Sequence, residues 1–152
     1  MKTTIKIFSF FFAVAALVAC AGAESEQLKQ ARTIQETMLK SKGNLDSLVD
    51  VKMNELSAKI TELSADSTLA TDSLKTATYT SIKSQLSDIE SLKSKLSDWM
   101  SNVKMLPTVE EIAKGAENPF GDGAKDQDIL KAIQDNQKQF DELKSEIETA
   151  IQ

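Results

Sequence analysis

Hydrophobic residues recur every three or four positions along most of this chain, which is the spacing of an amphipathic helix. The first stripe predicts a helix over about 25–64, with Ser25 as its N-cap. Its members are Leu28, Ala31, Ile34, Met38, Leu45, Val49, Met53, Leu56, Ile60 and Leu63. Gly43 interrupts the stripe, and glycine costs about 1 kcal/mol in a helix relative to alanine. The sequence therefore allows either one long kinked helix or two helices that meet at Gly43.

A polar connection at 64–68 precedes a second helix, predicted over about 70–105. Its apolar seam repeats every seven residues. The two sets of seam positions are Ile82, Ile89, Leu96 and Val103, and Gln85, Leu92, Trp99 and Leu106. Gln85 is polar, so it either specifies the register of the seam or marks its frayed end. Pro107 closes the helix, because the residue before a proline avoids helical geometry.

Two further helices complete the pattern. Thr108 and Glu111 have the spacing of a capping box and predict a short helix over 109–114, stopped by Gly115. After a loop at 118–123, a stripe from Ile129 to Ile151 predicts a last helix over 126–151, with Asp126 as its cap. No strand-like alternation occurs. We expect a single all-α domain over 25–152, either an antiparallel helical bundle or a long helical hairpin with a third packing helix.

The first twenty residues have a different pattern. Lys2 and Lys6 precede an apolar run at 7–18 that is short for a membrane span, and Leu17-Val18-Ala19-Cys20 follows. This segment resembles the lipobox of bacterial lipoproteins. The resemblance implies a signal peptide over 1–19, acyl chains such as palmitate on Cys20, and a tether over 20–24. The alternatives are an ordinary secretion signal cleaved near 21–23 and an uncleaved membrane anchor.

Composition narrows the class of protein further. Without Lys2 and Lys6, 16 basic residues remain against 23 acidic ones, a net charge of −7, which disfavours nucleic-acid partners. The chain has no histidine, and Cys20 is its only cysteine. These absences remove the commonest general base and the usual transition-metal ligands. We therefore expect a non-enzymatic protein that has no cofactor.

Two segments resemble a known group of proteins. One is 45–63, with Val49, Met53 and Leu56 as recurring points, and the other is Leu96-Ser97-Asp98-Trp99-Met100. Behind a lipobox, they resemble small Bacteroidota-type lipoproteins loosely labelled viral A-type inclusion protein-like, a group with no established activity. Relatives often carry a histidine where this chain has Asp46, so no role of that histidine carries over. The resemblance implies an envelope lipoprotein with paired helices.

Few side chains are candidates for chemistry. Trp99, on the seam, is either a recognition anchor or a core residue that plugs the end of the hairpin. Asp122, Asp126 and Asp128 offer carboxylate oxygens for a calcium ion, but they lack the spacing of a helix-loop-helix calcium site. Cys20, as the lipidated residue, is the main predicted site.

Together these features predict a lipid-anchored, non-enzymatic structural or protein-interaction lipoprotein of the bacterial cell envelope. We expect it on the outer membrane, either periplasm-facing or surface-exposed. Its expected partners are the membrane, through the acyl chains on Cys20, and an envelope protein or a second copy of the chain. The alternative is a carrier of a ligand or a divalent cation that uses the loop at 118–128.

Overall fold

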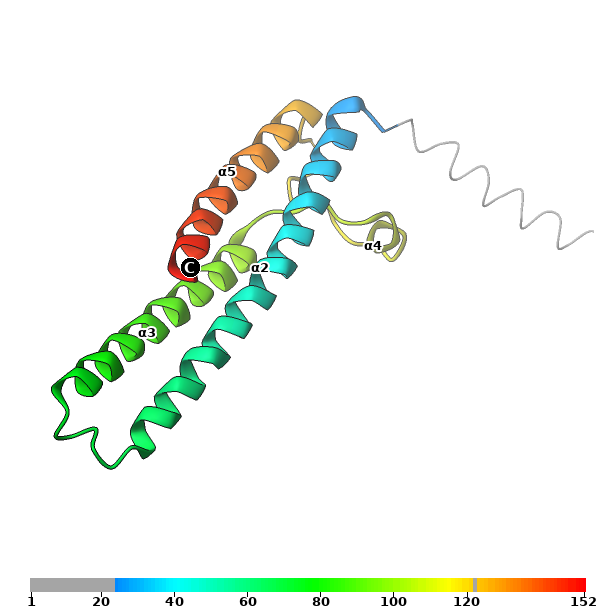
Figure 1. Ribbon diagram of the computed structural model, residues 1–152. Helices are drawn as coiled ribbons and strands as arrows, with labels where there is room; N and C mark the ends of the chain where they lie inside the picture. The colour runs from blue at the N-terminus through cyan, green and yellow to red at the C-terminus, as the bar shows by residue number, and fades with distance from the viewer. Residues whose placement is uncertain (1–23, 122) are drawn as a thin grey trace, which may run out of the picture.

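A computed structural model describes residues 24–121 and 123–152, and these residues form an all-α fold. The helices are α2 (Glu26–Ala65), α3 (Ser73–Asn102), α4 (Val109–Ala113) and α5 (Asp126–Ala150). The three long helices pack against one another, whereas α4 is a short helix set beside them (Figure 1). The predicted helical hairpin with a third packing helix is confirmed. The predicted signal peptide, Cys20 and Asp122 lie outside the described residues.

The third long helix covers only part of the hairpin. α3 runs antiparallel to α2, and α5 begins beside the start of α2 and runs parallel to it (Figure 1). At 1.5 Å per residue the 40 residues of α2 extend about 60 Å, but the 25 residues of α5 extend only about 37 Å. The last part of α2 and the first part of α3 therefore project beyond the end of α5 as a two-helix segment.

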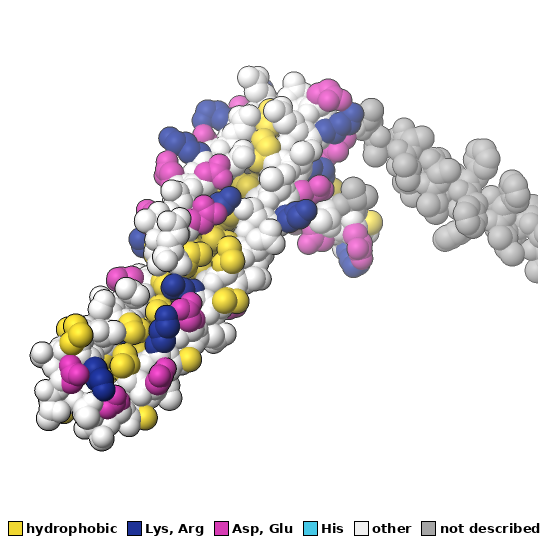
Figure 2. Space-filling view, viewed as in Figure 1, with side chains coloured by type: hydrophobic (Ala, Val, Ile, Leu, Met, Phe, Trp, Pro, Cys, Tyr) yellow, Lys and Arg dark blue, Asp and Glu magenta, His cyan; other side chains and the backbone are white. Residues whose placement is uncertain are grey.

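The core lies where the three long helices overlap. Its buried members follow a seven-residue interval within each helix, as in coiled-coil packing. They are Ala31, Met38, Leu45, Val49 and Leu56 of α2, Ile89 and Leu96 of α3, Leu106 of the following connection, and Ile129, Ile133, Phe140 and Ile147 of α5. Apolar side chains appear between the helices and charged ones on the outer faces (Figure 2). The helical spacing in the sequence therefore identifies the core.

α2 is one continuous helix through Gly43. It begins where the Ser25 hydroxyl accepts a hydrogen bond from the Leu28 amide at 3.2 Å, so the predicted N-cap is confirmed. Gly43 lies on the exposed side of the helix. On either side of it, Met38 and Leu45 are buried in the core. Because this packing is worth more than the helical cost of one glycine, the break that the sequence allows does not form.

The second helix begins and ends inside its predicted bounds. It starts at Ser73 because the Asp72 carboxylate accepts hydrogen bonds from the amides of Leu74 and Lys75. It ends at Asn102, five residues before Pro107. Val103, the residue that follows, already has an extended conformation. Proline marks where a helix cannot continue, but here the chain leaves the helix earlier for a tertiary reason described below.

One open expectation from the sequence is narrowed, and one is wrong. Gln85 is exposed, which fits the frayed end of the seam and not a role in its register; half-buried Ile82, as predicted, and Leu86 form the seam there. Asp126 is not the cap of α5 but its first residue; the N-cap is Lys125, whose side chain makes no capping hydrogen bond. Carboxylates in the first turn of a helix still suit its dipole, and Asp126 and Asp128 occupy that turn.

The short helix matches its prediction. Thr108 and Glu111 form the capping box, with Thr108 Oγ1 3.2 Å from the Glu111 amide and Glu111 Oε2 2.7 Å from the Thr108 amide. α4 ends at Ala113, and Gly115 follows with a φ of +88°, a left-handed conformation that side chains disfavour.

These two glycines give a matched pair of predictions. Gly43→Ala should raise the free energy of unfolding by about 1 kcal/mol, because alanine is the better helix former and no atom lies within 4 Å of the added Cβ. Gly115→Ala should instead lower it by about 1–2 kcal/mol, because alanine is strained at a positive φ. Urea unfolding followed by circular dichroism checks both, and a loss of stability in Gly43→Ala would contradict the account of α2 as one relaxed helix.

Candidate functional site

An extended segment, residues 103–107, joins the hairpin to the rest of the chain, and a buried glutamine holds it. Gln35 of α2 donates from Nε2 to the Leu106 carbonyl at 2.8 Å, and its Oε1 accepts from the Leu106 amide at 2.7 Å. Gln35 is 7 % exposed and Leu106 is 6 % exposed. Among the residues that the structure describes, Gln35 is the only buried polar side chain. Gln35 thus supplies hydrogen-bond partners for both the amide and the carbonyl of Leu106, a residue that belongs to no helix or sheet.

Two more side chains fix the same segment from neighbouring helices. Arg32 of α2 donates from Nη1 to the Pro107 carbonyl at 2.7 Å, and its Nε donates to the Glu24 carboxylate. Asn136 of α5 donates from Nδ2 to the Lys104 carbonyl at 3.0 Å. No pattern in the sequence predicts these three donors. The one signal was Gln35 itself, a polar residue in line with the apolar positions Ala31 and Met38.

A pocket of about 250 Å³ lies at the end of the bundle where α2 and α5 begin. Its apolar lining comes from four parts of the chain: Leu28, Leu106, Pro107, Ile112, Ala116 and Ile129 are among its residues. Polar atoms come from Arg32, Asn118 and Asp126. We call it the N-terminal pocket. Small-molecule sites usually measure about 300–1,000 Å³, so this pocket suits only a small or partial ligand.

A larger hollow, about 750 Å³, lies along α5. It is lined by Gln134, Gln137, Lys138, Asp141, Glu142 and Ser145. All six belong to one helix, so no second element closes the hollow, and it is the polar outer face of α5. We give it no role in binding.

Trp99, which with Cys20 is one of the two candidate residues outside the 118–128 loop, packs inside the bundle. Its ring centroid is 5.1 Å from that of Phe140, with the planes tilted by 38°. The indole Nε1 is buried and has no hydrogen-bond partner among the described residues. The ring therefore lies where α5 meets α3, and the other candidate, Cys20, lies outside the described residues.

The two-helix end of the molecule has a different character from the bundle. Within residues 57–88, all of which the structure describes, no side chain is buried; we call this segment the hairpin tip. Ile60, Tyr79 and Ile82 are half-buried between its two helices. Leu74 is 76 % exposed beside the turn. The tip therefore holds together through a narrow seam and offers its outer faces to solvent.

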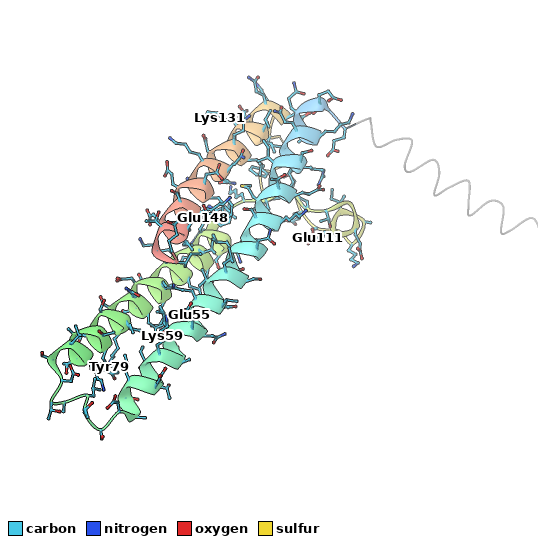
Figure 3. All side chains as sticks on the ribbon, in the orientation of Figure 1. Glu55, Lys59, Tyr79, Glu111, Lys131 and Glu148 are labelled. Atoms are coloured by element: carbon cyan, nitrogen blue, oxygen red, sulfur yellow. The ribbon has the colours of Figure 1, made fainter. Side chains whose placement is uncertain are left out.

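Charged side chains form a cluster on α2 near the start of the hairpin tip. Glu55 of α2 accepts from Lys59 at 2.6 Å and lies 3.8 Å from Lys52 (Figure 3). The hydrogen bond from Lys59, with the positive charge of Lys52, lowers the pKa of the Glu55 carboxyl. This ion-pair cluster therefore lies on α2 where the hairpin tip begins.

The turn between α2 and α3 is ordered by one carboxylate. Asp66 accepts hydrogen bonds from Lys75 Nζ and from both the amide and the hydroxyl of Thr68, at 2.5–2.8 Å. The Lys75 ammonium, followed by the two donors of Thr68, holds the pKa of Asp66 well below its ordinary value. The tip therefore closes through polar contacts at its turn.

Comparison with protein-family models, with curated proteins and with solved structures finds no match to this chain. The resemblance to small lipoproteins therefore rests on the residues quoted for it. Across the described ranges 24–121 and 123–152, no helix is long and apolar enough to cross a membrane. The same residues contain no group of three or more His, Cys, Asp or Glu side chains placed to hold a metal ion.

Removing the buried amide tests its importance. Gln35→Leu should lower the free energy of unfolding by about 1–3 kcal/mol, because the amide and carbonyl of Leu106 lose their partner in a buried place. The matched control is Gln85→Leu, the same change at an exposed position of α3, which should stay within about 0.5 kcal/mol of the original chain. Equal effects in urea unfolding would show that the Gln35 contacts add nothing to stability.

Proposed function

We propose that this chain is a lipid-anchored, non-enzymatic lipoprotein of the bacterial cell envelope that presents its hairpin tip to a protein partner. The anchor is Cys20, and the favoured location is the outer membrane, facing either the periplasm or the cell exterior. The observation that carries the proposal is the separation of the two ends of α2. One end follows the proposed tether directly, and the other forms part of the hairpin tip about 60 Å away.

The first support comes from the start of the described chain. Glu24 is bonded to Arg32, and α2 begins at Glu26, so the bundle begins at once after the proposed tether. Four extended residues reach at most about 14 Å, which would keep the bundle close to a membrane that holds Cys20. The tip would then extend away from that membrane.

The second support comes from the composition of the tip. Between 57 and 88 the side chains are mostly serine, threonine and alanine, and three basic residues face four acidic ones. The rest of the described chain carries most of the net negative charge. A nearly neutral surface of short side chains can approach another protein at little cost in charge repulsion or side-chain entropy.

The second candidate function is carriage of a small ligand by the loop at 118–128. One observation favours it, because Asn118, Ala124 and Asp126 of this loop line the N-terminal pocket. The cation version of this hypothesis has no such support. Calorimetric titration with calcium and magnesium tests it, and measurable heat with a rise in melting temperature would favour the carrier.

The anchor is tested by removing its thiol. In cells fed radiolabelled palmitate, Cys20→Ala should lose the label and move from the membrane fraction to the soluble fraction, because acyl chains supply the membrane affinity. The control Ala23→Ser keeps Cys20 and should keep both properties. A Cys20→Ala protein that still sediments with membranes would contradict the lipid anchor and favour an uncleaved one.

The interaction surface is tested by photo-crosslinking in cells. A photoreactive residue at position 74, on the tip, should give a discrete adduct with another protein, because Leu74 is 76 % exposed there. The same residue at position 138, on the polar outer face of α5, is the control and should not give that adduct. The proposed role of the tip fails if position 74 yields only uncrosslinked chain, or if both positions yield the same products.

A further inference from the structure

The N-terminal pocket has apolar lining that the core does not use. Ile112 of α4 lines it and is 49 % exposed, and it is not among the residues packed against the core. Leu28, from the first turn of α2, is half-buried; it packs partly against the core and lines the pocket from a different helix. An apolar occupant would remove both side chains from water, which is the main driving force for filling such a pocket.

The start of the described chain is tied to this pocket. Arg32 lines it and holds the carboxylate of Glu24, the first described residue. Cys20 precedes Glu24 by four residues, which reach at most about 14 Å. A group attached to Cys20 therefore starts within a short distance of the pocket, and its effective concentration there is high.

We propose that the N-terminal pocket takes part of an acyl chain carried by Cys20. The inference rests on the lipid anchor proposed above. A methylene group is about as large as a water molecule, which occupies about 30 Å³ in the liquid, so 250 Å³ holds about eight methylene groups. One chain is therefore accommodated in part, and the remaining chains stay in the bilayer.

The chemistry of the pocket fits the region where acyl chains begin. Arg32 and Asn118 carry N–H donors that suit the carbonyl oxygens of ester and amide groups, and Asp126 carries acceptors that suit an amide N–H. The apolar residues of the same pocket suit the alkyl chain itself. Moving an alkyl group from a bilayer to this pocket exchanges one apolar environment for another and changes its own free energy little. The favourable free energy comes instead from removing the side chains of Ile112 and Leu28 from water. The result would be a bundle docked on its own anchor.

The test uses the full chain in a bacterial host that is fed a fatty acid carrying a diazirine on its alkyl chain. Irradiation of intact cells should join the acyl chain on Cys20 to residues of the pocket, above all Ile112, as mapped by peptide mass spectrometry. Ala116→Leu fills the pocket and should abolish these crosslinks. Ala113→Leu, the same change at an exposed position of α4 outside the lining, is the matched control and should keep them.

A second variant guards against misfolding of the first. Ile112→Gln changes a half-exposed residue outside the core, so the melting temperature should stay close to that of the original chain while the crosslinks are lost. Crosslinks that persist in both Ala116→Leu and Ile112→Gln would overturn the inference.

The remaining outcomes separate this inference from the proposed function. The mass of the Cys20 peptide reports lipidation by itself, so an unmodified cysteine would overturn the anchor and this inference together. A lipidated cysteine whose probe reacts only with lipids would overturn the pocket inference and leave the anchor standing. Equal crosslinking of the Cys20→Ala chain by the free fatty acid would assign the pocket to an untethered ligand and overturn the tethered one.

Discussion

The pairing of the Gln35 amide with the backbone of Leu106 is the interaction on which the arrangement of the three helices depends. α3 ends at Asn102, before it reaches the start of α2, yet α5 begins beside that start (Figure 1). The chain covers that distance as an extended segment whose backbone is partly buried. Buried amides and carbonyls without partners are costly, and this segment has no helix or sheet to supply them. Gln35, Arg32 and Asn136 supply those partners, so α5 can lie parallel to α2 and close the core.

Most of the fold could be predicted from the sequence because it follows from local patterns. The heptad spacing identifies the core, and the caps at Ser25 and Thr108 need only neighbouring residues. The sequence is least decisive where tertiary contacts outweigh local preference. It leaves a break at Gly43 open, and the packing of Met38 and Leu45 keeps α2 one helix there; the contacts of Leu106 draw the chain out of α3 before Pro107 is reached. A heptad count alone also assigns Gln85 to a seam that in fact passes beside it.

The candidate site was much less predictable. Gln35 and Arg32 act on backbone carbonyls 71 and 75 residues away, and a carbonyl is present in every residue, so no side-chain pattern records the pairing. The N-terminal pocket is built from four separate segments, and its size follows from how they pack. Trp99 illustrates the intermediate case. Its heptad position predicts burial, but its contact with Phe140 depends on the register of α5.

The continuity of α2 has a mechanical consequence. The start of the described chain and the turn of the hairpin tip lie at opposite ends of this one helix. A tensile load applied between them therefore runs along the helix axis, where successive turns are in series and each carries the full load. The contacts between helices are not on that path, since α3 and α5 are joined to α2 from the side. Because α2 is one helix through Gly43, no break in helical structure interrupts this path between its two ends.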